Sequence, residues 1–154
     1  MIPEIYTVNS QSVAAEPERV FALAADVTAW PELLSHYRYV RVLDGGDTSR
    51  TVAMGAQRGG FPVRWTAIQE IRPDRLEIYY RHVAGVTRGM DVLWQIEGAV
   101  GGSRAIITHR LQPDRWWLQS GVSRWVVGTV FVMAIADRTL AGIAARAEAD
   151  GSRL

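Results

Sequence analysis

The sequence predicts an α+β fold, in which a curved antiparallel sheet of seven strands surrounds one long C-terminal helix. Three observations lead to this prediction. The last thirty or so residues before the C-terminus have helical periodicity, most of the preceding chain alternates with a period of two, and one short region near the start is helical. A single long helix needs an apolar surface to lie on, and a sheet is the only other element present in quantity.

The C-terminal stretch 116–148 contains no proline and carries little charge. Beyond Asp137 it becomes amphipathic, with an apolar stripe at the three- and four-residue spacing of a helix. The stripe consists of Leu140, Ile143, Ala144 and Ala147. As one continuous helix, the stretch would be ~45 Å long.

The N-terminal region predicts one strand and then two short helices. The strand covers Ile5–Val13, and Pro17 suits the first turn of the helix that follows. We expect the segment 26–31 to end that helix, because the residue before Pro31 disfavours the α region. A second short helix is expected at 32–34.

The middle of the chain predicts six strands joined by short turns. These strands are expected at 37–43, 51–58, 61–71, 76–82, 90–97 and 105–111, with Gly55 marking a bulge. Strands that follow one another through short turns form an antiparallel meander. With no repeat or linker in the sequence, we expect a single domain over residues 1–154.

Composition argues against several classes of protein. The net charge is only +1, which disfavours nucleic acid as a partner. The chain has no cysteine, and its three histidines lack the spacing of metal ligands, so we expect no metal site. No phosphate loop or dinucleotide fingerprint occurs, and we expect no cofactor. No signal peptide is evident at the N-terminus, which favours a cytoplasmic location.

The apolar run 125–136 raises the question of a membrane span. A spanning helix needs about twenty apolar residues, and polar residues and Arg124 interrupt the run on its N-terminal side. A helix packed on the sheet is the better interpretation. Its second apolar face could then meet a partner subunit in a homodimer or a membrane surface.

The inward face of the predicted sheet is large and aromatic. Such a stripe can simply fill a core, but polar residues at Gln69 and His82 lie in phase with it. Apolar walls with a few placed polar groups are typical of a ligand pocket. The alternatives are a backbone-bonded Gln69 at a strand end and a solvated His82 at an edge.

The order of these segments resembles the polyketide cyclase/dehydrase branch of the START-like (helix-grip, SRPBCC) superfamily. The resemblance rests on Trp30-Pro31 followed by Tyr37, on Arg64-Trp65 with Glu70, on Gly89-Met90 with Trp94, and on the closing helix. It implies a helix-grip fold around a hydrophobic cavity. Relatives of this kind include aromatase/cyclases, coenzyme-Q-binding carriers and lipid-transfer proteins.

One departure from the resembled family concerns the chemistry. The aromatase/cyclases that the chain resembles carry a cavity arginine four residues after the strand tryptophan, where this chain has Gln69, and a small polar residue where it has Ala67. A neutral amide can hydrogen-bond a carbonyl but stabilises an anion less than a cation does. The resemblance therefore implies the pocket more strongly than the catalysis.

Two functions remain open from the sequence. In the first, the cavity promotes cyclisation or dehydration of a polyketide-like substrate, with Tyr37 and His82 transferring protons and Gln69 orienting a carbonyl. In the second, it only binds or transfers a lipid, quinone or polyketide. The candidate ligand-binding residues are Trp30, Met54, Trp65, Ala67, Ile78, Tyr80, Met90, Val92, Trp94 and Phe131.

Overall fold

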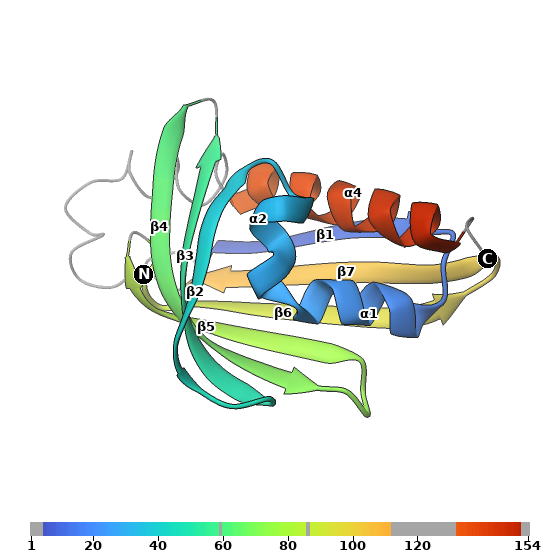
Figure 1. Ribbon diagram of the computed structural model, residues 1–154, viewed down its shortest axis with the longest axis horizontal. Coiled ribbons are helices and arrows are strands. Elements are labelled where there is room, and N and C mark those ends of the chain that lie inside the picture. Colours follow the sequence, from blue (N-terminus) through green and yellow to red (C-terminus); the bar gives the residue numbers. More distant parts are fainter. Residues whose placement is uncertain (1–4, 59, 86, 112–131, 152–154) are drawn as a thin grey trace.

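A computed structural model describes residues 5–58, 60–85, 87–111 and 132–151. It contains seven strands in one antiparallel sheet, two short α-helices and a 3₁₀ turn after the first strand, and a C-terminal helix (Figure 1). The predicted fold class is thus confirmed. The part of the predicted long helix that falls on residues 116–131 lies outside the described residues.

The seven strands follow the predicted order. They are β1 (Ile5–Val13), β2 (Tyr37–Gly45), β3 (Ser49–Arg58), β4 (Phe61–Arg72), β5 (Glu77–Gly85), β6 (Met90–Ala99) and β7 (Gly102–Leu111). Their order in the sheet is β1-β7-β6-β5-β4-β3-β2, so the meander runs from β2 to β7 and β1 adds to its far side. Figure 1 shows how strongly the sheet bends, with β3 and β4 running steeply across the direction of β1 and β7.

The short helices lie between β1 and β2. Helix α1 (Pro17–Ala25) starts at the predicted proline, and a 3₁₀ turn (Val27–Ala29) leads directly into α2 (Trp30–Leu33). The sequence predicts that Pro31 lies between two helices, the second of them at 32–34. Instead it occupies the first turn of α2, where its missing N–H is not needed.

Helix α4 (Val132–Gly151) covers the concave side of the sheet and packs on β1, β3, β7 and the two short α-helices (Figure 1). Its predicted apolar stripe is buried, as Leu140 and Ala147 illustrate. Polar contacts also hold it in place. Asn9 of β1 donates from Nδ2 to Asp137 Oδ1 at 2.7 Å, and His36 Nε2 lies 2.9 Å from Thr139 Oγ1.

No helix within the described ranges is long and apolar enough to cross a bilayer. The run 125–136, which raised the question of a span, a homodimer contact or a membrane surface, falls mostly outside those ranges.

A bulge does lie beside Gly55, but its extra residue is in the neighbouring strand. Tyr37 pairs with Ala56 and Tyr39 with Gly55, so the unpaired residue is Arg38 of β2, and another register shift in β2 lies between Val42 and Asp44. Gly55 has a different role, because a Cβ atom there would overlap the Tyr39 ring. A further bulge lies in β5, where Thr66 pairs with Ala84 and Ala67 with His82. Bulges bend and twist a strand locally, which fits the curvature of the sheet.

Gly85 ends β5 opposite Trp65, and its backbone has a φ of +99°. A Cβ atom at this position would overlap the Arg64 carbonyl oxygen and lie 2.8 Å from Trp65 Cα. Those atoms belong to the backbone of a central strand and cannot move aside cheaply. Gly101 also has a positive φ, of +81°, but nothing lies within 4 Å of its Cβ position.

We therefore expect Gly85→Ala to lower the free energy of unfolding by about 3 kcal/mol, from left-handed strain and overpacking together. Gly101→Ala carries only the strain and should cost about 1 kcal/mol. Urea denaturation of both variants measures the difference. Equal losses would show that the close approach of β4 to Gly85 does not matter for stability.

Candidate functional site

Five aromatic rings form a continuous row inside the fold. The Trp30 ring lies 5.8 Å from that of Trp94 and 5.0 Å from that of Tyr37. Tyr37 meets Trp65 edge-on at 6.0 Å, and Trp65 stacks on His82 at 5.7 Å with an interplanar angle of 7°. These separations are typical of favourable aromatic pairs. The row connects α2 and β2 with the central strands β4, β5 and β6.

A cavity of about 80 Å³ lies along this row, between the sheet and α4. Its lining is Trp30, Tyr37, Met54, Val63, Trp65, Tyr80, His82, Thr87, Met90, Val92, Trp94, Ile107, His109, Ile135, Ala136 and Thr139. Most of these side chains are apolar or aromatic, and the few polar ones come from different parts of the fold. The composition is that of a small-molecule site.

The structure brings most of the sequence-predicted site residues to this cavity. Those at its lining are Tyr37, His82, Trp30, Met54, Trp65, Tyr80, Met90, Val92 and Trp94. Three others, Gln69, Ala67 and Ile78, are fully buried but do not line it. Phe131 lies outside the described residues.

His82 is buried rather than solvated at an edge. It is 8% exposed, and its Nδ1 lies 2.5 Å from the Thr87 hydroxyl oxygen. Burial disfavours the charged imidazolium and lowers the pKa of His82 to about 3, with nearby His109 acting in the same direction. At neutral pH His82 is therefore an uncharged ring held in orientation by Thr87.

His109 of β7 is a second imidazole at the cavity. Burial lowers its pKa to about 4. Its Nδ1 is buried and has no hydrogen-bond partner among the described residues. A buried polar atom without a partner is costly, so a polar group of a bound molecule would gain by reaching it.

Two phenols also line the cavity. Burial raises the pKa of Tyr37, against a side-chain hydrogen bond with Thr139. Burial also raises the pKa of Tyr80, against a hydrogen bond from Gln69. Both hydroxyls stay protonated at neutral pH and are suited to donate hydrogen bonds to an oxygen atom.

Gln69 is tied into a polar network next to the cavity. Arg50 of β3 donates from Nε to Gln69 Oε1 at 2.6 Å. Gln69 Nε2 in turn donates to the Tyr80 hydroxyl at 2.9 Å and to the Ala25 carbonyl oxygen at 3.3 Å. Its amide is thus fully engaged, and a positive charge that the sequence analysis did not anticipate lies directly behind it.

Sequence reasoning missed several lining residues. They are Val63, Thr87, Ile107, His109, Ile135, Ala136 and Thr139. Strand alternation does indicate His109, because it lies two residues after Ile107 and two before Leu111, which are both buried on the inner face. Thr139 precedes the apolar stripe of α4 by one residue, and nothing in its spacing separates a cavity position from a packed one.

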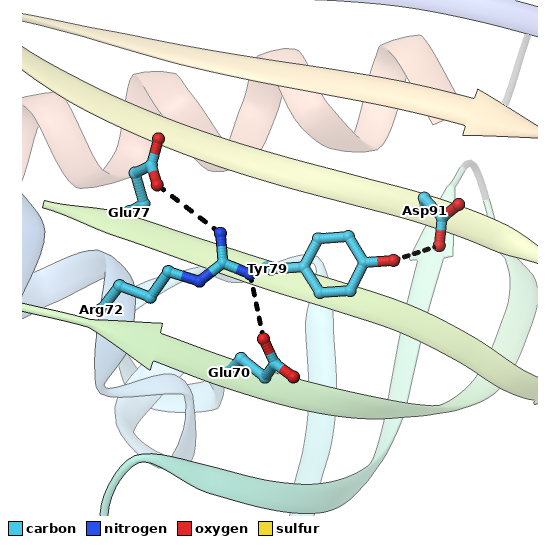
Figure 2. Close-up of polar contacts among 5 residues, drawn as sticks. All are labelled: Glu70, Arg72, Glu77, Tyr79 and Asp91. Atoms are coloured by element: carbon cyan, nitrogen blue, oxygen red, sulfur yellow. Dashed lines mark hydrogen bonds and ion pairs between the residues drawn. The ribbon is translucent and has the colours of Figure 1, made fainter. Parts of the chain in front are cut away.

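The convex face of the sheet carries a separate polar cluster (Figure 2). Arg72 lies between Glu70 and Glu77, with N–O distances of 3.0 and 3.6 Å, and the Tyr79 hydroxyl donates to Asp91 at 2.5 Å. These side chains alternate with the inward row. Asp91 therefore lies on the face away from the cavity.

No group of three or more potential metal-binding side chains occurs in the part of the chain that the structure describes.

Comparison with known proteins supports the resemblance. The sequence profile of the family described as polyketide cyclase/dehydrase and lipid transport matches residues 13–137. A search among curated proteins finds no significant match.

Several solved structures share the fold. The chain is similar to the Zhui aromatase/cyclase from Streptomyces sp. R1128, with 19% identity, a TM-score of 0.81, and coverage of 95% of this chain and 94% of that one. A protein from Thermus thermophilus is 21% identical with a TM-score of 0.76, over 96% and 99% of the two chains. The di-domain ARO/CYC StfQ from the steffimycin biosynthetic pathway is 13% identical with a TM-score of 0.80, over 97% of this chain and 52% of that one. At these identities the likeness shows the fold alone.

The depressed pKa of His82 has a consequence for stability. In the unfolded chain the imidazole has its ordinary pKa of 6.5, whereas in the folded protein the pKa is about 3. Between these values the unfolded state binds a proton that the folded state does not. Stability therefore falls as the pH falls through this window.

We expect His82→Gln to make the fall between pH 6.5 and 5 shallower, by about 1 kcal/mol per pH unit, which is close to the full value for one proton. Urea denaturation at several pH values gives the slope. The slope is informative even if the variant is less stable at every pH. An unchanged slope would mean that folded His82 already titrates normally.

Proposed function

Because the chain belongs to the polyketide cyclase/dehydrase and lipid transport family, we propose that it binds a polyketide-like, carbonyl-bearing molecule in the cavity and promotes its cyclisation or dehydration. One observation carries the proposal. Tyr37, Tyr80, His82 and His109 line a space whose other walls, apart from Thr87 and Thr139, are apolar and aromatic side chains. Such a lining recognises a flat molecule with a few oxygen atoms.

In an aldol cyclisation, an enol carbon attacks a carbonyl carbon of the same chain. The α-carbon loses a proton, the carbonyl oxygen gains one, and dehydration later expels water. The aromatic walls would hold the two carbons together, which is a large part of the catalysis of an intramolecular step. Protonated Tyr37 would donate to the carbonyl oxygen as negative charge develops there.

The proposed roles of His82 and Gln69 follow from their surroundings. His82 is neutral and can accept the α-proton, although a pKa of about 3 makes it a weak base in the empty cavity. Gln69 does not line the cavity, and both of its amide hydrogens are engaged. We therefore propose that Gln69 influences a substrate carbonyl through Tyr80 instead of touching it.

The size of the cavity limits what it holds as it stands. Drug-sized ligands occupy about 300–1,000 Å³, whereas this cavity measures about 80 Å³. In this conformation the cavity accommodates only part of such a ligand. A molecule with a ring and a side chain requires the lining side chains to move. Met54 and Met90 both line the cavity and are flexible enough to change rotamer at low cost.

A second candidate function, binding or transfer without chemistry, is favoured by the histidines. A general base works best when its pKa is near the working pH, and burial moves the pKa values of His82 and His109 several units below it. A carrier needs no base. A lipid, quinone or finished polyketide could occupy the same cavity.

Mass spectrometry of ligands extracted from the purified protein tests the choice between these functions. We expect a small aromatic or polyketide-like compound that bears carbonyl or phenol oxygens. Recovery of a cyclised product after incubation with a linear poly-β-ketone would support catalysis. Recovery of the unaltered precursor, or of ordinary lipids alone, would support the carrier.

Combined Tyr37→Phe and His82→Ala substitution should lower cyclisation turnover at least about 100-fold, the lower end of what proton transfer by side chains contributes. Leu43→Ala, at a position 59% exposed on β2, is the matched control and should leave turnover unchanged. Circular dichroism would establish that each variant is folded. Full turnover in a folded double variant would remove both residues from the mechanism.

A further inference from the structure

A row of three polar side chains crosses the inner face of the sheet at the end nearest α1. Arg50 of β3, Gln69 of β4 and Tyr80 of β5 are cross-strand partners in register, since Arg50 pairs with Gln69 and Gln69 with Tyr80. Gln69 is 0% exposed and Tyr80 is 4% exposed. Tyr80 lines the cavity, whereas Arg50 and Gln69 do not.

The directions of the hydrogen bonds in this row are determined by its chemistry. The Arg50 guanidinium can only donate, so the atom it meets at 2.6 Å is the Gln69 carbonyl oxygen. The Gln69 amide nitrogen then uses its two hydrogens on the Tyr80 hydroxyl and the Ala25 carbonyl oxygen, at 2.9 and 3.3 Å. The Tyr80 oxygen must therefore accept from Gln69.

This arrangement leaves the Tyr80 hydroxyl proton without an acceptor among the described residues. The hydroxyl is buried, so an acceptor supplied by a bound ligand would form a hydrogen bond with it away from water. The positive charge of Arg50 favours negative charge on the Tyr80 oxygen, although burial outweighs it. A donor that is itself polarised by a neighbouring hydrogen bond gives a stronger bond to an acceptor.

We propose that Arg50 and Gln69 position and polarise the Tyr80 hydroxyl so that it donates a hydrogen bond to a carbonyl or enolate oxygen of the bound molecule. The proposal rests on the proposed function, because it places a ligand in the same cavity. It also narrows the ligand class to compounds with an oxygen acceptor beside an aromatic ring, as opposed to hydrocarbon chains. Arg50 and Gln69 are positioning residues here, since only Tyr80 would touch the ligand.

A purely structural role for this row makes a different prediction. Arg50 and Gln69 both donate to the Ala25 carbonyl oxygen, at 3.2 and 3.3 Å, and so satisfy the C-terminal end of α1. If that were their whole role, substitutions would lower stability but would not alter the bond between Tyr80 and a ligand. The test must therefore observe the ligand oxygen directly.

Two small probes of matched shape serve this purpose. Acetophenone carries a carbonyl group where ethylbenzene carries a methylene, and both contain one aromatic ring. Isotope-edited infrared spectroscopy of acetophenone labelled with ¹³C at its carbonyl reports the strength of the hydrogen bond to its oxygen. Titration of each probe gives its dissociation constant.

In Tyr80→Phe we expect the carbonyl stretch to move to higher frequency and acetophenone to bind about 3- to 10-fold more weakly, the usual effect of one hydrogen bond. Ethylbenzene binding should change less than about twofold, because it has no acceptor. In Arg50→Met the frequency should fall between those of the wild type and Tyr80→Phe. Arg41→Met, which removes an exposed charge from β2, is the matched control and should leave the frequency unchanged.

Gln69→Glu tests the same hydrogen-bond arrangement if Arg50→Met does not fold. A carboxylate at this position keeps a partner for Arg50 but accepts the Tyr80 proton instead of donating to the Tyr80 oxygen. The Tyr80 hydroxyl then donates to the introduced carboxylate and no longer to the ligand, so the frequency of the carbonyl stretch should rise as it does in Tyr80→Phe.

The outcomes separate this inference from the function on which it rests. Binding of both probes with one carbonyl frequency in the wild type, Tyr80→Phe and Gln69→Glu would overturn the inference and leave the cavity function standing. If the carbonyl frequency changed in Tyr80→Phe but not in Arg50→Met, Arg50 would have no part in polarising the Tyr80 hydroxyl. Failure of both probes to bind the wild-type protein would contradict the cavity function itself.

Discussion

The packing of aromatic rings between the sheet and α4 is the constraint on which the rest of this structure depends. Rings from α2, β2, β4, β5 and β6 meet edge-on, tilted or stacked, from Trp94 through Trp30 to His82. Aromatic rings bury a large area and prefer a few mutual orientations. Beside this row lies a cavity that the described side chains line but do not fill.

Burial also determines the chemistry of the polar groups at this cavity. The low-dielectric surroundings keep the imidazoles of His82 and His109 uncharged and keep the phenols of Tyr37 and Tyr80 protonated. The site therefore offers neutral donors and acceptors and no bare charge among the described residues. This suits recognition of ketone, enol or phenol oxygens, and it limits how strongly any one group could act as a base.

The positive charge of Arg50 lies behind Gln69 and Tyr80, and of these three residues only Tyr80 lines the cavity. Arg50 donates to Gln69, and Gln69 donates to Tyr80, while the Arg50 guanidinium is also bonded to the end of α1 and the residue is only partly buried. A guanidinium inside the aromatic walls would have to lose much of its hydration. A relay through a neutral amide transmits part of its polarising effect at lower cost. The same contacts join α1 to the sheet, which links the shape of the cavity to its electrostatics.

The sequence alone determined the elements and the inner face of the sheet, because strand alternation is a local geometric property. Trp65, Tyr80 and Trp94 could be assigned inward from their phase, and His82 followed from the same alternation. Only the tertiary structure decided which inward residues border the cavity and which, like Ala67, do not. That depends on bulges, on sheet curvature and on where α4 lies. The pairing of Arg50 with Gln69 likewise follows from strand register, which joins residues nineteen positions apart and has no signature in either segment.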